Sequence, residues 1–410
     1  MRIAVVSVDQ RPLRAGSRDW ITGSAVHMTE LSAALARLGH DVRVYTRRSS
    51  PSQPEQATDA DGITLVNAPI GPARTAHPGE QLCHLNPFGQ WLDRSWRDDW
   101  APDVVHAHTW PSAVAALVAK KMTSRPTVVT FHGVAEPLGD HGQGDRVAAF
   151  RRRVEQAAAG EADAVLALSH SDAHHMRRLG IPRTKVSVIP PGVDTAQFQP
   201  SGPAWNRRRP HRILAVGQLI PSNGFADTVA ALPGLPDTEL VIIGRPPPPS
   251  RGLGPHAAAL RASAVNTGTH DRLRLTGAVP YRDMPGWYRS ADLLVCTPSH
   301  ASLNRAALEA MACGVPVMAA ATGGLSEAVT DGTVGRLIPP GSPAQLVATI
   351  HALLTDPELR GAYGLAGIER ARLEYSWHQA AQRTLDTYRR TLGHHVAAPR
   401  GRQTATAAAA

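Results

Sequence analysis

Glu309 and the pair Gly323-Gly324 are the residues of the second half of the chain that are best placed to do chemistry. Glu309 stands near the start of the predicted helix ALEAMACG, where a carboxylate could accept two hydrogen bonds from the vicinal hydroxyls of a ribose. The alternative is a solvated glutamate stabilised by the helix dipole. The glycine pair follows a predicted strand and precedes a predicted helix, so its backbone could approach and hold diphosphate oxygens, although an isolated pair is more often only a turn.

The first half of the chain offers a histidine and a glycine at comparable positions. His132 follows the strand TVVTF and precedes Gly133, which would place its ring at the mouth of a cleft; the alternative is a loop histidine with no task. Gly23 opens a predicted helix in a turn that would face the same cleft. His106 and His108 alternate along a strand end, but two histidines without a carboxylate partner are more often structural, so the sequence predicts no metal site.

These residues depend on an alternation of strands and helices that runs through the whole chain. Short β-branched runs predict strands at residues 3–8, 42–46, 63–66, 104–107, 127–131, 164–168 and 186–189, with helices at 24–38, 88–99, 112–121, 145–159 and 171–178. After a Pro- and Gly-rich segment at 190–203, a second series of strands is predicted at 212–217, 239–244, 272–277, 292–297 and 315–320. The pattern predicts an α/β fold of two Rossmann-like, doubly wound parallel sheets facing a central cleft at the carboxyl ends of their strands.

Length and composition bound the class of protein. A chain of 410 residues favours two domains, and it contains neither a signal-peptide pattern nor the ~18 to 20 apolar residues of a membrane span. Three cysteines in apolar surroundings are too few for a disulfide framework or metal cluster, which indicates a reduced, cytoplasmic compartment. The net charge of +9 is scattered and comes without a nucleic-acid-binding motif, so we expect a solvated basic surface or a peripheral contact with the inner, anionic face of a membrane, and no nucleic acid.

Several stretches, taken together, resemble glycosyltransferase family 4, a group of retaining, nucleotide-sugar-dependent enzymes with the GT-B fold. They include VGQLIPSNGFADTVAAL at 216–232, ALEAMACGVPVMAAATGGLSEAVTDGTVGRLIPPGSP at 307–343, VVTFHG at 128–133 and VSVIPPGVD at 186–194. The resemblance spans nearly the whole chain. It implies an acceptor domain at 1–195, a nucleotide-sugar domain at 196–375 and a helix at 376–395 that crosses back to the first domain. The low-complexity composition of residues 396–410 separately predicts a disordered tail.

The resemblance also implies an activity and a set of site residues. The activity is transfer of a sugar from a nucleoside diphosphate sugar to a hydroxyl acceptor with retention, without a metal or another cofactor. His132 would lie beside the reacting sugar and Glu309 would bind the ribose. The remaining donor-site positions are Gly23, Gly217, Gln218, Asn223, Gly323 and Gly324.

The charged positions of the family pattern are altered in this chain. Gln218 and Asn223 replace an Arg and a Lys, and Ala301 replaces a Glu eight residues before Glu309. Because retaining transfer depends on stabilising the departing diphosphate, three such losses could lower the rate by about 10³ to 10⁶ unless other groups substitute. Arg305, at a helix start facing the cleft, and Arg245, after the strand ELVIIG, could substitute; the alternative for each is a surface arginine. Two hypotheses follow: an active transferase, or a weakened or inactive homologue that acts as a partner or regulatory subunit.

Overall fold

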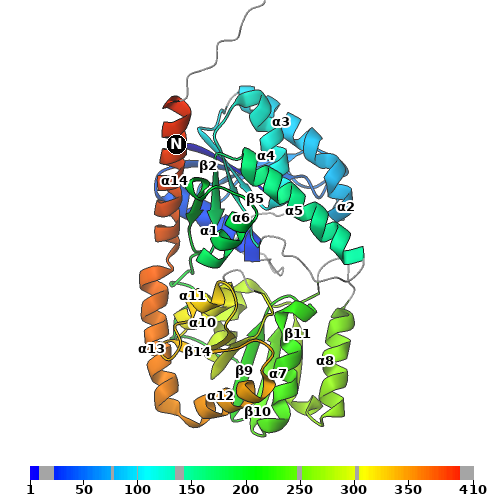
Figure 1. The fold of residues 1–410 in the computed structure, drawn as a ribbon, viewed down its shortest axis with the longest axis vertical. Helices are drawn as coiled ribbons and strands as arrows, with labels where there is room; N and C mark the ends of the chain where they lie inside the picture. Colours follow the sequence, from blue (N-terminus) through cyan, green and yellow to red (C-terminus); the bar gives the residue numbers. More distant parts are fainter. Residues whose placement is uncertain are drawn as a thin grey trace, which may run out of the picture.

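The chain folds into two units, each built on one sheet of mostly parallel strands, and its last two helices run one beside each unit (Figure 1). The computed structural model describes residues 1–8, 23–74, 78–98, 100–133, 143–246, 252–300 and 304–397. Ala301 therefore lies outside the described residues, and so does the predicted tail beyond residue 397.

The N-terminal unit is built on a sheet with the strand order β3-β4-β2-β1-β5-β6-β7-β8. Its strands are β1 (Arg2–Val6), β2 (Asp41–Arg47), β3 (Gln56–Thr58), β4 (Thr64–Ala68), β5 (Val104–His108), β6 (Thr127–Thr130), β7 (Ala164–Ala167) and β8 (Val186–Val188). All neighbouring strands pair in parallel except β3 and β4. Its helices are α1 (Gly23–Arg37), α2 (Pro78–Gln81), α3 (Leu85–Asp98), α4 (Trp110–Thr123), α5 (Gln143–Glu161) and α6 (His170–Arg178).

The C-terminal unit is built on a fully parallel sheet with the strand order β11-β10-β9-β12-β13-β14. Its strands are β9 (His211–Val216), β10 (Thr238–Ile243), β11 (Leu273–Gly277), β12 (Leu293–Cys296), β13 (Val317–Ala320) and β14 (Gly335–Ile338). Its helices are α7 (Phe225–Ala231), α8 (Gly254–Asn266), α9 (Met284–Arg289), α10 (Arg305–Ala312), α11 (Leu325–Ala328), α12 (Pro343–Thr355) and α13 (Pro357–Glu374).

Both sheets reverse their winding direction at an internal pair of strands. In the N-terminal sheet β1 lies between β2 and β5, and in the C-terminal sheet β9 lies between β10 and β12. The connections on the two sides of such a pair leave in opposite directions, so a crevice opens beyond the carboxyl ends of the two strands. The segments that follow β9 and β12 are therefore the expected place for a ligand.

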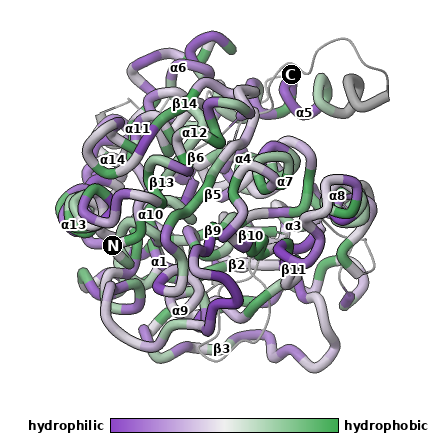
Figure 2. Tube along the Cα trace, turned by 90° about the horizontal axis from the view of Figure 1, so that it is seen from below, coloured by the Kyte–Doolittle hydropathy of each residue, from purple (hydrophilic) through white to green (hydrophobic). Residues whose placement is uncertain are grey.

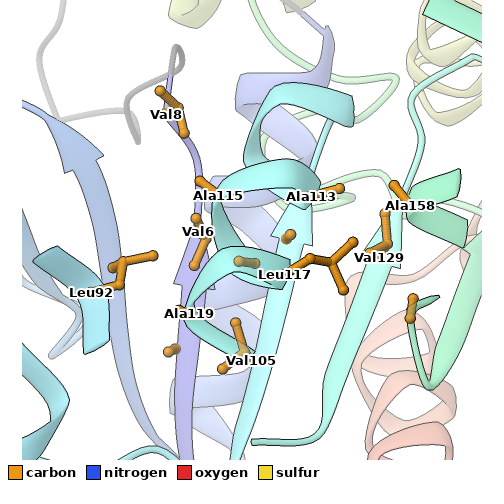
Figure 3. Packing of buried hydrophobic residues seen from close by; sticks show 14 of the residues in the cluster. Val6, Val8, Leu92, Val105, Ala113, Ala115, Leu117, Ala119, Val129 and Ala158 are labelled. Atoms are coloured by element: carbon orange, nitrogen blue, oxygen red, sulfur yellow. The ribbon is translucent and has the colours of Figure 1, made fainter. Parts of the chain in front are cut away.

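Helices cover both faces of each sheet because the strands are apolar on both faces. Four hydrophobic clusters form the cores, two in each unit. Figure 3 shows one of them, in which Ala113, Ala115 and Ala119 of α4 lie over the valines of the neighbouring strands. In Figure 2 the outer helices α8 and α13 alternate between hydrophobic and hydrophilic residues.

The last helix, α14 (Trp377–Ala397), returns to the N-terminal unit and packs on α1. Tyr388 of this helix is fully buried there. The chain crosses between the units twice, and the crossings touch: the N–H of Val193 donates to the carbonyl of Tyr375 at 2.7 Å. A Cβ atom on Gly192 would lie 2.4 Å from the backbone nitrogen of Trp377, so only glycine permits this approach.

The structure corrects some sequence predictions. The helix α14 continues to Ala397, so the predicted tail boundary at 396 is two residues too early. Cys83, which its sequence context suggested was buried, is an exposed free thiol. Within the described part of the chain, no helix is both long and apolar enough to cross a membrane.

Candidate active site

A cavity of about 480 Å³ lies between the two units, and residues of both line it. The N-terminal unit contributes Gly23, Ser24 and His132. The C-terminal unit contributes the remaining lining residues: Val216, Gly217, Gln218, Ile220, Asn223, Val279, Tyr281, Met284, Asn304, Arg305, Ala306 and Glu309. The structure thus brings together seven of the nine site residues predicted from the sequence, all except Gly323 and Gly324.

The segments after β9 and β12 supply most of the polar groups on the C-terminal side, as the reversal of winding predicts. Asn304 caps α10, because its side-chain oxygen accepts a hydrogen bond from the N–H of Ala306 at 3.0 Å. The cap places Arg305 in the first turn of α10 and Glu309 one turn later on the same face. Both side chains therefore point to the cavity from one helix.

Glu309 is buried, with 2% of its surface exposed, and its carboxylate has three partners. Oε1 accepts from the Tyr281 hydroxyl at 3.0 Å and pairs with Arg305 at 2.9 Å, and Oε2 accepts from the Tyr288 hydroxyl at 2.8 Å. A carboxylate offers about four acceptor positions, so one remains on Oε2. The structure excludes the solvated alternative for Glu309, but it leaves room for one further donor rather than the two that the sequence suggested.

The two tyrosines were not predicted as site residues. Burial, together with the neighbouring Glu309 carboxylate, raises the pKa of both phenols well above the usual range, so they remain protonated hydrogen-bond donors. They stand seven residues apart around α9, two helical turns, and this spacing was the available signal that they share a face. Their partner Glu309 lies on another helix, α10, so the seven-residue spacing alone could not show that the two hydroxyls meet its carboxylate.

Arg305 is the one cation among the described residues that line the cavity. Its side chain is 16% exposed, and its guanidinium lies over the Tyr281 ring at 5.2 Å from the centroid. Besides the ion pair with Glu309, its Nε and Nη1 atoms are buried and have no hydrogen-bond partner among the described residues. Buried donors without partners are costly, so this guanidinium is suited to an anion entering the cavity.

Gln218 and Asn223 occupy the places where the family pattern has cations. Asn223 ends a short 3₁₀ turn (Pro221–Asn223), and its amide nitrogen donates to the Gln218 carbonyl at 2.7 Å. Both side chains are uncharged and line the cavity. Arg245, the other substitute considered from the sequence, is exposed and is not among the residues that line the cavity.

Four histidines of the N-terminal unit form a cluster beneath the cavity: His27, His106, His108 and His132. Nδ1 of His108 lies 3.1 Å from Nε2 of His132, a hydrogen bond in which one ring donates to the other. His27 meets His132 edge to face at 4.9 Å between ring centroids. His106 bonds to Thr130 at 2.7 Å and to the Tyr388 hydroxyl of α14 at 2.6 Å. His106 of β5 thus joins β6 and α14 through its two ring nitrogens.

Burial keeps this histidine cluster neutral. It lowers the pKa of His106 to about 3 and of His132 to about 4, and with the neighbouring imidazoles it lowers the pKa of His27 and His108 well below 6.5. The described residues contain no group of three His, Cys, Asp or Glu side chains placed to hold a metal ion. His132 therefore reaches the cavity as an uncharged imidazole.

A second cavity of about 160 Å³ adjoins the first and shares Gly23, Ser24, His132 and Arg305 with it. Its remaining lining residues are His27, Leu168 and Pro191. The Nδ1 atom of His27 is buried without a hydrogen-bond partner among the described residues. The shared residues place the two cavities next to each other between the units.

Gly323 and Gly324 stand apart from the residues that line the cavities. They precede α11, a helix of four residues, and Gly323 adopts a left-handed φ of 46°. The predicted contact of their backbone with a diphosphate remains a prediction. Glu327 of α11, which the sequence analysis did not single out, bonds instead to the N-terminal unit.

Comparison with known proteins places this geometry among transferases. The model of Glycosyltransferase Family 4 matches residues 21–197, and that of Glycosyl transferases group 1 matches residues 204–370. D-inositol 3-phosphate glycosyltransferase of Kribbella flavida is 33% identical over 95% of each chain. Sucrose-phosphate synthase of Thermosynechococcus elongatus has the same fold, with a TM-score of 0.85 over 96% of this chain and 99% of its own at 23% identity. Anabaena HepE, solved with UDP-glucose, has a TM-score of 0.73 over 95% of this chain and 100% of its own at 19% identity.

Proposed function

The chain belongs to glycosyltransferase family 4, and on that premise we propose that it transfers a sugar from a nucleoside diphosphate sugar to a hydroxyl acceptor with retention. One observation carries the proposal: the cavity between the units combines a buried carboxylate, Glu309, with a guanidinium, Arg305, that has unused donors. Relatives named as glycosyltransferases align over nearly the whole chain, which supports an enzyme over an inactive partner subunit.

The donor fits the C-terminal side of the cavity. We assign the ribose to Glu309, whose Oε2 still has an acceptor position, and the diphosphate to Arg305, the cation beside it. Val216, Val279 and Met284 supply the apolar surface that a base or sugar ring covers. HepE of Anabaena was solved with UDP-glucose, which supports a uridine nucleotide as the first donor to test.

Retention agrees with the groups that the described lining residues provide. Glu309 is engaged by three donors, and the neutral His132, with a pKa near 4, is a weak base at neutral pH. Neither is suited to deprotonating an acceptor for attack on the opposite face of the sugar. Arg305 can instead neutralise the charge that develops on the departing diphosphate, which is what a retaining transfer requires of the protein. His132 would hold the reacting sugar by hydrogen bonds.

The test is turnover with a defined stereochemical readout. The protein is incubated with UDP- or GDP-sugars and a panel of hydroxyl acceptors, and D-inositol 3-phosphate is the first because the relatives bear its name. We expect release of nucleoside diphosphate, activity that persists in EDTA, and a product whose anomeric coupling constant in proton NMR matches that of the donor. An inverted product would refute retention, and no release from any nucleotide sugar would refute the transferase.

A further inference from the structure

Glu327 links the two units at the edge of the site. It lies on α11 of the C-terminal unit, and its carboxylate accepts two hydrogen bonds from α6 of the N-terminal unit. The N–H of His170 donates to Oε2 and the N–H of Ser171 donates to Oε1, both at 2.8 Å. In Figure 1, α11 lies at the top of the C-terminal unit, facing the N-terminal unit.

The carboxylate completes the N-terminal cap of α6. The first N–H groups of a helix have no partner within it, and here the side chain of Ser169 accepts only from Asp172, at 3.0 Å. The carbonyl of Ser169 accepts from Ala173. Glu327 satisfies the two remaining N–H groups and sets a negative charge at the positive end of the helix dipole.

The backbone carbonyl of Glu327 is fixed by hydrogen bonds from within the C-terminal part of the chain. Arg370 of α13 donates to the carbonyls of Glu327 and Ala328 at 3.0 and 3.1 Å, and the Tyr375 hydroxyl donates to the Glu327 carbonyl at 3.4 Å. Tyr375 also accepts from Val193 where the chain crosses between the units. Hydrogen bonds from α13 and Tyr375 thus fix the backbone of Glu327, and Tyr375 also connects this segment to Val193, where the chain passes between the units.

The bond lies next to the cavities. Leu168, two residues before His170, lines the smaller cavity together with Arg305 and His132. A small displacement of α6 relative to α11 would therefore change the distance between the N-terminal and C-terminal walls of the site. We propose that Glu327 is a positioning residue that fixes the relative orientation of the two units, so that His132 faces the groups of the C-terminal unit.

This inference rests on the proposed function only for its kinetic readout, because the orientation of the units can be measured without a ligand. Glu327→Ala removes both acceptors. His170→Pro removes one donor from the other side: position 170 is the first residue of α6, where proline is tolerated, and Ser169 before it is extended. Glu369→Gln, an exposed glutamate on α13, is the matched control.

Small-angle X-ray scattering of the full chain gives the first readout. We expect the radius of gyration to rise in Glu327→Ala and His170→Pro, with no further rise in the double variant, and to stay at the wild-type value in Glu369→Gln. Circular dichroism checks that each variant is folded. Unchanged radii in both folded single variants, or an equal change in the control, would overturn the proposal whether or not the protein is a transferase.

Kinetics give the second readout. Because the nucleotide groups lie on the C-terminal unit, we expect Glu327→Ala to bind UDP within about twofold of wild type while kcat falls about tenfold, the effect of one favourable charge at a helix N-terminus. A merely destabilised C-terminal unit would lose UDP binding instead. Equal losses of affinity and kcat would contradict the positioning role.

Discussion

Replacing Arg305 separates binding from stability more sharply than any other change in the cavity. Arg305→Met keeps the length and apolar volume of the side chain but removes the guanidinium. The variant loses the 2.9 Å ion pair with Glu309 and the two buried nitrogen atoms that have no partner among the described residues. The lost ion pair affects the free energy of unfolding and the lost nitrogen donors affect the affinity for nucleoside diphosphate, so the two effects can be estimated separately.

Two opposing effects act on the stability of the protein without nucleotide. Removing one partner of a buried ion pair costs about 3 to 5 kcal/mol, but removing two buried, unsatisfied donors returns about 1 to 3 kcal/mol each. Tyr281 and Tyr288 continue to donate to the Glu309 carboxylate. We therefore expect the free energy of unfolding, measured in urea, to change by no more than about 3 kcal/mol in either direction.

The affinity for nucleoside diphosphate should fall. A charge-assisted hydrogen bond is worth about 1.5 to 3 kcal/mol, which corresponds to a rise of about 10- to 150-fold in the Kd for UDP by isothermal titration calorimetry. Arg305→Lys keeps the positive charge but lacks the planar guanidinium, so its Kd for UDP should lie between the values of the wild-type protein and of Arg305→Met. Arg336→Met, an exposed arginine paired with Asp331, is the control. Wild-type affinity in Arg305→Met would refute the assignment of the diphosphate.

Three further predictions concern pH, backbone space and charge. The histidine cluster stays neutral in the folded protein down to about pH 4, whereas the same histidines bind protons near pH 6.5 in the unfolded chain. Because the unfolded state then binds more protons, the free energy of unfolding should fall as the pH is lowered from 6.5 to 4, by about 1.4 kcal/mol per pH unit for each histidine. Urea unfolding midpoints measured across this range test the prediction. Burial raises the pKa of Glu30 to about 7, so this one carboxyl makes the free energy of unfolding rise as the pH is lowered, but it is a single group against several histidines. In Gly224→Ala, with φ at 70° and the new Cβ 1.8 Å from the Thr297 carbonyl, the melting temperature should drop far more than in Gly332→Ala, with φ at 72° in open space; equal drops would contradict the contact. Asn223→Lys adds a cation to the cavity wall and should tighten UDP binding at low salt, an advantage that 1 M salt removes; a salt-independent change would count against an electrostatic cause.

Much of the fold follows from the sequence because apolar runs and turn residues act locally. The predicted strands agree with the observed ones within one or two residues, for example 42–46 against Asp41–Arg47. No bounds were predicted for the helix α13, in which Gly361, Gly364 and Gly367 lower the helix propensity. The structure explains Gly364: a Cβ there would lie 2.4 Å from the Gly314 carbonyl, so close packing against the end of α10 overrides propensity.

The candidate site was predictable where one segment carries the signal, and not where partners come from distant elements. Arg305 and Glu309 share one helix face, so their spacing of four residues predicts that they meet. Tyr288 reaches Glu309 from a different helix, and no local pattern reveals that pairing. The role of Glu327 could not be predicted either, because its partners are backbone N–H groups of α6, and these are present whatever the residue type.

The most direct test of the central claim, that the cavity between the units binds a nucleoside diphosphate through Glu309 and Arg305, is thermal unfolding with a panel of nucleotides. At 100 times its Kd a bound nucleotide adds about 2.7 kcal/mol to the free energy of unfolding, a clear rise in melting temperature. We expect that rise with UDP or GDP in the wild-type protein and a much smaller one in Glu309→Ala. No rise with any nucleotide, or the same rise in Glu309→Ala, would contradict the account.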